Sequence, residues 1–116
     1  MMPGLLRKLF APRRVPLEFK NEFPISLTLR PKQLRAAAEE SAFLIPAVAQ
    51  FQHAYSEIRC PVRIVHGARD QLIEAQQSRR LEKVVGHSLL HLVQDAGHMV
   101  TYARDAHIVD AVSALR

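Results

Sequence analysis

The stretch that decides the fold runs from residue 62 to residue 98 and reads VRIVHGARDQLIEAQQSRRLEKVVGHSLLHLVQDAGH. It contains two short apolar runs, Val62–Val65 and Leu89–Val93, which are predicted to be β-strands. Between them, Glu74–Val85 has the spacing of an amphipathic helix, and Gly86 is a natural residue to end it. A strand, a helix and a second strand in this order form a unit with parallel strands and a right-handed crossover. The sequence therefore predicts an α/β fold.

The segments on both sides of this unit are predicted to be helical. Asp105–Leu115 has apolar residues along one face of a helix. Closely spaced prolines in the first thirty residues leave room only for short helical turns, which we place at Leu5–Phe10 and Glu18–Phe23. These prolines are Pro3, Pro12, Pro16 and Pro24.

A longer helix is predicted to begin at Pro31, because proline suits a first helical turn and good helix formers follow it. Pro46 is expected to end or kink this helix, and Ala47–Ile58 is expected to continue as a second helical piece. Three aromatic residues of this part are expected to be packing residues: Phe43, Phe51 and Tyr55. We therefore expect a helical, proline-punctuated part, residues 1–57, and a β-α-β-α part, residues 58–116.

The composition is that of a globular protein, with 48% apolar and 23% charged residues in a chain of 116. Its one cysteine, Cys60, excludes an internal disulfide framework and is expected to be a small buried residue at the start of a strand. No stretch approaches the roughly 18 consecutive apolar residues that a membrane span needs, and the first ten residues lack the features of a secretory signal. We expect a cytoplasmic protein without a membrane span.

Positive charge is concentrated in the first 35 residues. Eight lysines and arginines against two glutamates give this segment a charge of +6, whereas the whole chain carries +5. Such a segment suits an anionic partner, nucleic acid or lipid headgroups, and its first 17 residues have the composition of a transit peptide. However, no nucleic-acid-binding motif and few aromatic residues accompany the charges. We interpret the segment as a solvated surface and do not expect nucleic acid as a partner.

Two polar residues follow the predicted strands at matching distances. Asp70 lies five residues after Val65, and His98 lies five residues after Val93. Parallel strands end at the same edge of a sheet, about 4.8 Å apart, so this carboxylate and this imidazole are able to hydrogen-bond. The carboxylate would fix the tautomer of the ring and leave the other nitrogen as a general base. On spacing alone, a turn cap at Asp70 and an ordinary loop histidine at His98 are equally good interpretations.

The two strands, their loops and the helix between them resemble the C-terminal end of an alpha/beta-hydrolase. In that family a proline and apolar residues open the penultimate strand, which leads to a glycine and an aspartate; the last strand leads to Gly-His, often followed by Met. The residues that carry the resemblance are Pro61, Val62, Gly67, Asp70, Gly97, His98 and Met99. The resemblance covers residues 58–115. It implies that Asp70 is the acid and His98 the base of a catalytic triad, and that the helices upstream are cap-like.

A serine nucleophile is missing from the pattern. In the family it stands on a tight strand-to-helix turn of the form G-x-S-x-G, whereas glycine occurs here only at positions 4, 67, 86 and 97. The loops that form the family's oxyanion hole also precede every segment matched here. Two strands do not make the family's sheet, and the outer edge of Val62–Val65 would stay open to self-association.

The resemblance implies hydrolysis of a small ester-like substrate by a Ser-Asp-His mechanism, with no cofactor and no metal. Because the nucleophile is missing, we expect a truncated or split form with little activity alone, and its standing as an enzyme stays open. The rival interpretation is a non-catalytic remnant that dimerises or docks onto a complementary N-terminal half. Esterases, carbon–carbon hydrolases, epoxide hydrolases and dehalogenases share this ending, so the substrate and the nucleophile, Ser or Asp, stay open too.

Other side chains near the same edge have simpler interpretations. His66 is expected to position its loop. A metal held by His66, Asp70 and His98 is conceivable from ligand chemistry, but no ligand-spacing motif supports it, so we expect none. Asp95 and Glu74 are alternative carboxylates, each placed behind Asp70.

Overall fold

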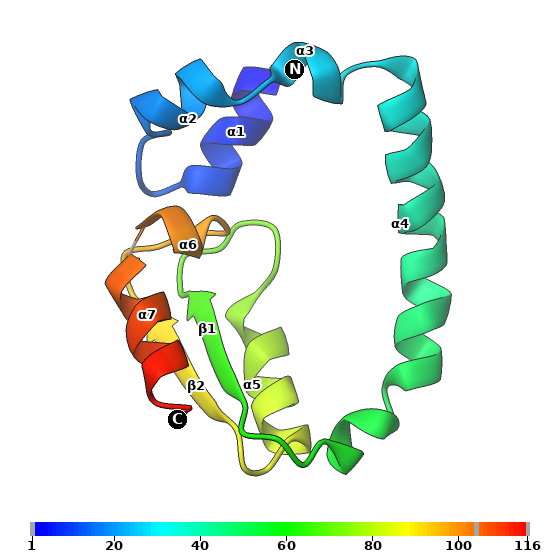
Figure 1. Cartoon of the computed structure of the whole chain (residues 1–116), viewed down its shortest axis with the longest axis vertical. Coiled ribbons are helices and arrows are strands. Elements are labelled where there is room, and N and C mark those ends of the chain that lie inside the picture. Colours follow the sequence, from blue (N-terminus) through cyan, green and yellow to red (C-terminus); the bar gives the residue numbers. More distant parts are fainter. Residues whose placement is uncertain (1, 104, 116) are drawn as a thin grey trace. The chain divides into compact units, whose positions relative to one another are not determined.

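The computed structural model of the protein describes residues 2–103 and 105–115 (Figure 1). Its elements follow in this order: α1 (Met2–Phe10), α2 (Leu17–Glu22), α3 (Ile25–Thr28), α4 (Pro31–Phe51), the 3₁₀ turn η1 (Ala54–Glu57), β1 (Arg63–Gly67), α5 (Ala75–Val84), β2 (Leu89–Val93), α6 (Val100–Ala103) and α7 (Asp105–Ser113). Contacts divide the chain into two compact units, Met1–Val15 with Ser56–Arg116, and Pro16–Tyr55. The expected division between residues 57 and 58 lies close to the second junction, while the first fifteen residues cluster with the C-terminal part.

The sheet of the first unit is parallel, as the sequence predicts. β1 pairs with β2 in a register that places Arg63 beside Leu89 and Gly67 beside Val93. α5 contacts both strands and α7 contacts β1 (Figure 1). Within the described residues β1 has β2 as its single strand partner, so its outer edge carries unpaired backbone groups. The unit is therefore a mixed α/β structure with one free strand edge.

Side chains that alternate along the strands face helices on opposite sides of the sheet. His66 faces α5, to which its ring is hydrogen-bonded. Arg63 points the other way and donates a hydrogen bond to the carbonyl oxygen of Ala114, just after α7, at 3.3 Å. His91 also lies on this side, with its ring centroid 4.7 Å from that of His107 on α7. The sheet is thus a middle layer between α5 and α7.

The bounds of the two strands, α5 and α7 agree closely with the predicted ones, whereas α1 begins three residues before the predicted turn Leu5–Phe10. β2 has the predicted bounds, whereas β1 begins one residue later and ends two residues later than expected. α5 is one residue shorter at each end, and α7 is two residues shorter at its C-terminal end. The prediction that Cys60 is buried is wrong, because the side chain precedes the strand and is exposed.

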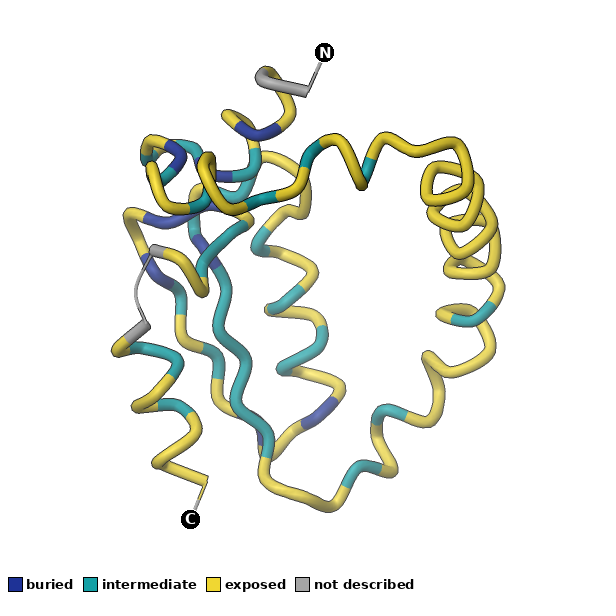
Figure 2. Tube along the Cα trace, turned by 45° about the horizontal axis from the view of Figure 1, so that its top comes forward, coloured by how far each residue is buried: buried dark blue, intermediate teal, exposed yellow. Residues whose placement is uncertain are grey.

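The core of the first unit combines residues that are far apart in the sequence (Figure 2). Among the side chains that the structure describes, half of the buried apolar ones come from the N-terminal segment, and the others follow or end α5 and β2: Leu6, Phe10, Val15, Val85, Val93 and Ala96. Leu6 and Phe10 are four residues apart, so they share one face of α1. This corrects the interpretation of the basic N-terminus as a solvated segment, because residues 6–15 supply part of the core.

Two glycines allow backbone segments to meet at the carboxyl edge of the sheet. A Cβ atom on Gly67 would overlap the carbonyl oxygen of Gly97 and lie 2.6 Å from that of Ala96. A Cβ atom on Gly97 would overlap the carbonyl oxygen of Ala11. Neither glycine has a positive φ, so the position requires space rather than unusual backbone angles. The loops after β1 and β2 and the segment after α1 are therefore in direct backbone contact.

The second unit contains α2, α3 and α4, and α4 is exposed along nearly all of its length (Figure 2). α4 is one 21-residue helix that continues through Pro46 to Phe51, so the helix does not end at Pro46. Ala42, whose carbonyl group loses its donor there, is exposed, and water can take the place of that donor. Phe43 and Phe51 are exposed rather than packed. No helix in the described part of the chain is long and apolar enough to cross a membrane.

Candidate active site

The two predicted site residues meet at the carboxyl edge of the sheet. Asp70 lies in the loop after β1 and His98 in the loop after β2, and Nδ1 of His98 is 2.9 Å from Oδ2 of Asp70. An ionised carboxylate can only accept hydrogen bonds, so Nδ1 carries the proton and donates it. In the neutral ring Nε2 then carries the lone pair. The spacing argument from the sequence is confirmed as far as the contact between these two side chains is concerned.

Asp70 is held in place from two directions. Its Oδ1 accepts hydrogen bonds from the backbone N–H groups of Leu72 (2.8 Å) and Ile73 (3.0 Å), and its side chain is 4% exposed. Burial alone would raise the pKa of Asp70, but the backbone bonds from Ile73 and Leu72 and the bond from His98 outweigh it. The pKa of the carboxyl group therefore lies below its ordinary value of 3.8. Asp70 is both a turn cap and the partner of His98, so the two interpretations of this residue are combined.

His66 is the second histidine beside this carboxylate, with Nε2 at 3.7 Å from Oδ2 of Asp70. The same nitrogen donates to the carbonyl oxygen of Ile73 at 3.2 Å, and Nδ1 accepts from the hydroxyl of Ser78 on α5 at 2.8 Å. A carbonyl can only accept, so the neutral ring of His66 carries its proton on Nε2, the opposite tautomer to that of His98. Both ring nitrogens of His66 are occupied, and the residue ties the loop after β1 to α5.

The loop that carries His98 is covered by the end of α1 and the segment that follows it. The N–H of Met99 donates to the carbonyl oxygen of Leu9 at 3.0 Å. Arg13 forms an ion pair with the carboxylate of Asp95, and its Nε donates to the Asp95 carbonyl oxygen at 3.2 Å. Phe10 packs edge-on against Tyr102, with ring centroids 5.8 Å apart. The segment Leu9–Arg13 therefore holds the loop in the position that presents His98 to Asp70.

No pattern in the sequence predicts this cover. The sequence offers Asp95 as an alternative acid, but its carboxylate binds Arg13 instead. Glu74 lies directly before α5 and is exposed. The available signal was the pair of apolar residues Leu6 and Phe10 at helical spacing, which marks a face that must be buried. The neighbouring arginines favour the interpretation of this segment as a charged, solvated surface instead.

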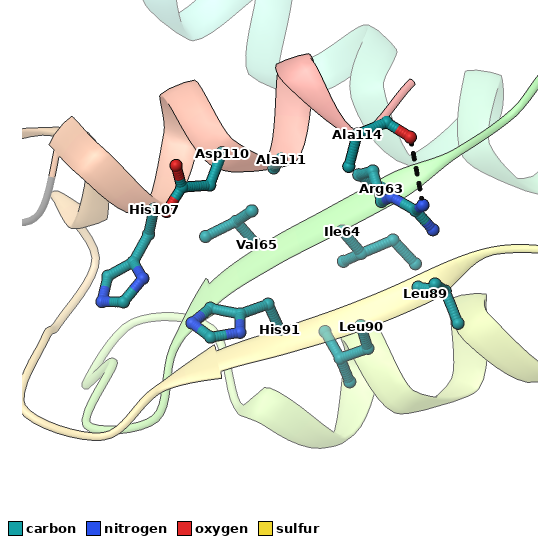
Figure 3. A pocket seen from close by; sticks show the side chains of 10 residues that line it. All are labelled: Arg63, Ile64, Val65, Leu89, Leu90, His91, His107, Asp110, Ala111 and Ala114. Atoms are coloured by element: carbon teal, nitrogen blue, oxygen red, sulfur yellow. Dashed lines mark hydrogen bonds between the residues drawn. The ribbon is translucent and has the colours of Figure 1, made fainter. Parts of the chain in front are cut away.

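A separate hollow of about 470 Å³ lies between β2 and α7 (Figure 3). It forms because α7 covers β1 and leaves the same face of β2 open, so that Leu89 and His91 are exposed. Its lining residues belong to the strands, to α7 and to Ala114 just after α7, and none comes from the loops that carry Asp70 and His98. This hollow is therefore distinct from the place where Asp70 and His98 meet. No cluster of three side chains suited to a metal ion occurs within the residues that the structure describes.

Comparison with protein-family models, with curated proteins and with solved structures gives no match. The class of site therefore rests on the geometry alone. That geometry is a buried, ionised carboxylate that orients an imidazole at the carboxyl edge of a parallel sheet.

Proposed function

We propose that Asp70 and His98 are the acid and the base of a hydrolytic site of the alpha/beta-hydrolase kind, acting on a small ester-like substrate. The observation that carries the proposal is the 2.9 Å bond from Nδ1 of His98 to a carboxylate that two backbone N–H groups hold in place. A fixed carboxylate on one ring nitrogen leaves the other as a base and stabilises the imidazolium ion when that base takes a proton.

The proposed chemistry follows from the free nitrogen. Nε2 of His98 takes the proton of a hydroxyl nucleophile as the oxygen attacks the ester carbonyl, and later gives that proton to the departing alkoxide. In the second half Nε2 takes a proton from water as the water oxygen attacks the acyl group, and it gives that proton to the oxygen of the nucleophile as the bond to the acyl group breaks and the acid is released. The low pKa of Asp70 keeps its carboxylate ionised throughout. Because G-x-S-x-G cannot be formed from the four glycines of the chain, we propose that the nucleophile comes from outside these 116 residues.

The tautomer of His98 tests the pair directly. At a pH where the ring is neutral, ¹⁵N NMR is expected to show Nδ1–H for His98 and Nε2–H for His66. In Asp70→Asn the amide oxygen is needed by the two backbone N–H groups, so its NH₂ faces His98 and donates to Nδ1. The proton of His98 is then expected to move to Nε2. The same change at exposed Asp110 on α7 is the control, and Nε2–H at His98 in the wild type would contradict the proposal.

Activity tests the second half of the proposal. With p-nitrophenyl butyrate, the chain alone is expected to give no saturable release of p-nitrophenolate. Methanol then stands in for the nucleophile, and methyl butyrate is expected to form faster with the wild type than with His98→Ala. Equal rates for the two proteins would refute the role of His98 as a base. Saturable release without methanol, abolished in His98→Ala, would show instead that the nucleophile lies within the chain.

A further inference from the structure

α4 carries a stripe of small and apolar side chains at alternating spacings of three and four residues. This seam consists of Leu34, Ala37, Ser41, Leu44, Val48 and Phe51. Spacings of three and four repeat every seven residues, which is the pattern by which one helix packs lengthwise against another. We infer that α4 pairs through this seam with α4 of a second copy of the chain, in antiparallel orientation. This interaction is independent of the hydrolytic site proposed above.

Most of the seam is exposed, although Ala37 lines a hollow together with Leu27 and Thr28 of α3. Its four large side chains are 47% to 62% exposed, and the flanking residues Phe43 and Ile45 are exposed still further. Ser41 is the one polar member, and its hydroxyl already donates to the carbonyl oxygen of Ala37 at 2.7 Å. No polar group of the seam therefore requires a partner across the interface. A continuous apolar stripe of this kind marks an interaction surface, because soluble proteins seldom expose one.

An antiparallel second copy fits the order of side chains along the seam. When the twofold axis passes between Ala42 and Phe43, Ala37 lies opposite Val48 of the other copy and Ser41 lies opposite Leu44. Leu34 then lies opposite Phe51. Each of these three pairings occurs twice because of the twofold axis, and the four inner layers pair a small side chain with a large one. Such alternation allows two helices to approach closely and fill the space between them.

The charges of α4 favour the same orientation. Its four charged residues lie in the N-terminal half and outside the seam: Lys32, Arg35, Glu39 and Glu40. Arg35 and Glu39 are paired with each other at 3.6 Å, one turn apart. In an antiparallel pair these charges lie beside the uncharged half, residues 41–51, of the other copy, and the helix dipoles oppose each other favourably. In a parallel pair each charged residue would lie at the same height as the identical residue of the other copy, so that like charges would be level with each other. Pro46 stands on the face opposite the seam and does not obstruct the contact.

The mass of the full chain in solution tests the inference. Light scattering over a range of concentrations is expected to show a reversible dimer for the wild type and a monomer for the double variant Leu44→Glu, Val48→Glu. Gln50→Glu adds a charge to the outer face of the same helix and is expected to leave the dimer intact. Circular dichroism checks that all three proteins are equally helical. A wild type that is monomeric throughout would overturn the proposal, and so would a double variant that still dimerises, because the free edge of β1 would then be the contact.

A second measurement tests the orientation. A spin label at position 33, introduced as Gln33→Cys in a Cys60→Ser background, lies beyond the end of the seam. In the antiparallel pair residue 33 of one copy faces residue 52 of the other, so the two labels are separated by about 28 Å along the helix axis. In a parallel pair the labels would lie about 10 Å apart, at the distance between the helix axes. The long separation is expected, and the short one would overturn the antiparallel arrangement.

Discussion

The short N-terminal segment Met2–Val15 contributes to the core, whereas the much longer helix α4 does not, although their lengths suggest the opposite. The segment contains a nine-residue helix and is crowded with arginines, yet it contributes three buried apolar side chains to the first unit. α4 has 21 residues and good helix formers, yet none of its side chains is buried. An isolated short helix is unstable in water, so α1 depends on its packing, whereas α4 has apolar surface to spare for a partner. The two regions show that the burial of apolar side chains, rather than helical propensity, decides which helix contributes to the core.

The largest difference between the two regions is expected when one phenylalanine in each is replaced by alanine. Phe10 is 5% exposed on α1, so Phe10→Ala leaves a cavity and is expected to lower the free energy of unfolding by about 3–5 kcal/mol. Phe43 is 74% exposed on α4, so Phe43→Ala is expected to change it by less than about 0.5 kcal/mol. Urea denaturation of the two variants measures the difference. Equal losses would show that the comparison between the regions is wrong.

A methyl group on glycine gives the next largest contrast. Gly97→Ala forces the carbonyl of Ala11 away from the loop and is expected to cost about 1–3 kcal/mol of unfolding free energy. Gly4→Ala, in a part of α1 where a Cβ atom meets nothing within 4 Å, is expected to stabilise the chain by up to about 1 kcal/mol. Thermal denaturation distinguishes the two, and a harmless Gly97→Ala would mean that α1 does not press on the loop.

Low pH is expected to lower the free energy of unfolding through Asp70, in the first unit, and not through the exposed helix α4. Its pKa is lower in the folded chain than its ordinary value of 3.8, so the unfolded state binds more protons in this range. The contribution of Asp70 to stability is present above pH 3.8 and is lost as the pH falls through the pKa of the folded state. Asp70→Asn is expected to flatten the acid side of the curve of unfolding free energy against pH. Glu39→Gln, on exposed α4, is the control, and identical curves for Asp70→Asn and the wild type would contradict the assignment.

The smallest effect is expected from the Arg13–Asp95 ion pair. The side chains are 36% and 53% exposed, so solvent screens the attraction and the pair is expected to contribute less than about 1 kcal/mol. A double-mutant cycle of Arg13→Ala and Asp95→Ala, repeated at high salt, measures the coupling energy. A coupling that is larger and insensitive to salt would mean that the pair anchors the segment more strongly than its exposure implies.

The sequence predicts the second half of the first unit well because that half is built from local patterns. Apolar runs specify β1 and β2, helical spacing specifies α5 and α7, and the parallel pairing follows from their order. The contact between Asp70 and His98 was predicted for the same reason, since equal offsets from paired strands bring two side chains together. Pro46 does not end the helix, because an exposed helix tolerates the loss of one hydrogen bond.

The cover over His98 escaped prediction because its contacts leave no pattern in the sequence. Leu9 and Ala11 meet the loop through backbone carbonyl groups, which every residue possesses. Arg13 and Asp95 are 82 positions apart, and many other pairings of opposite charges are equally compatible with the sequence. Such contacts are specified only by the assembled core, after Leu6 and Phe10 have found their place.

The close backbone contact between Ala11 and Gly97 also determines when α1 can find its place during synthesis. Residues near 11 leave the ribosome well before those near 97, so α1 waits for its site until most of the chain has been made. During that interval Leu6, Phe10 and Val15 have no core to enter, and long-range contacts of this kind slow folding. Until then these apolar side chains are exposed, so the newly made chain is expected to be more prone to aggregation than its small size suggests.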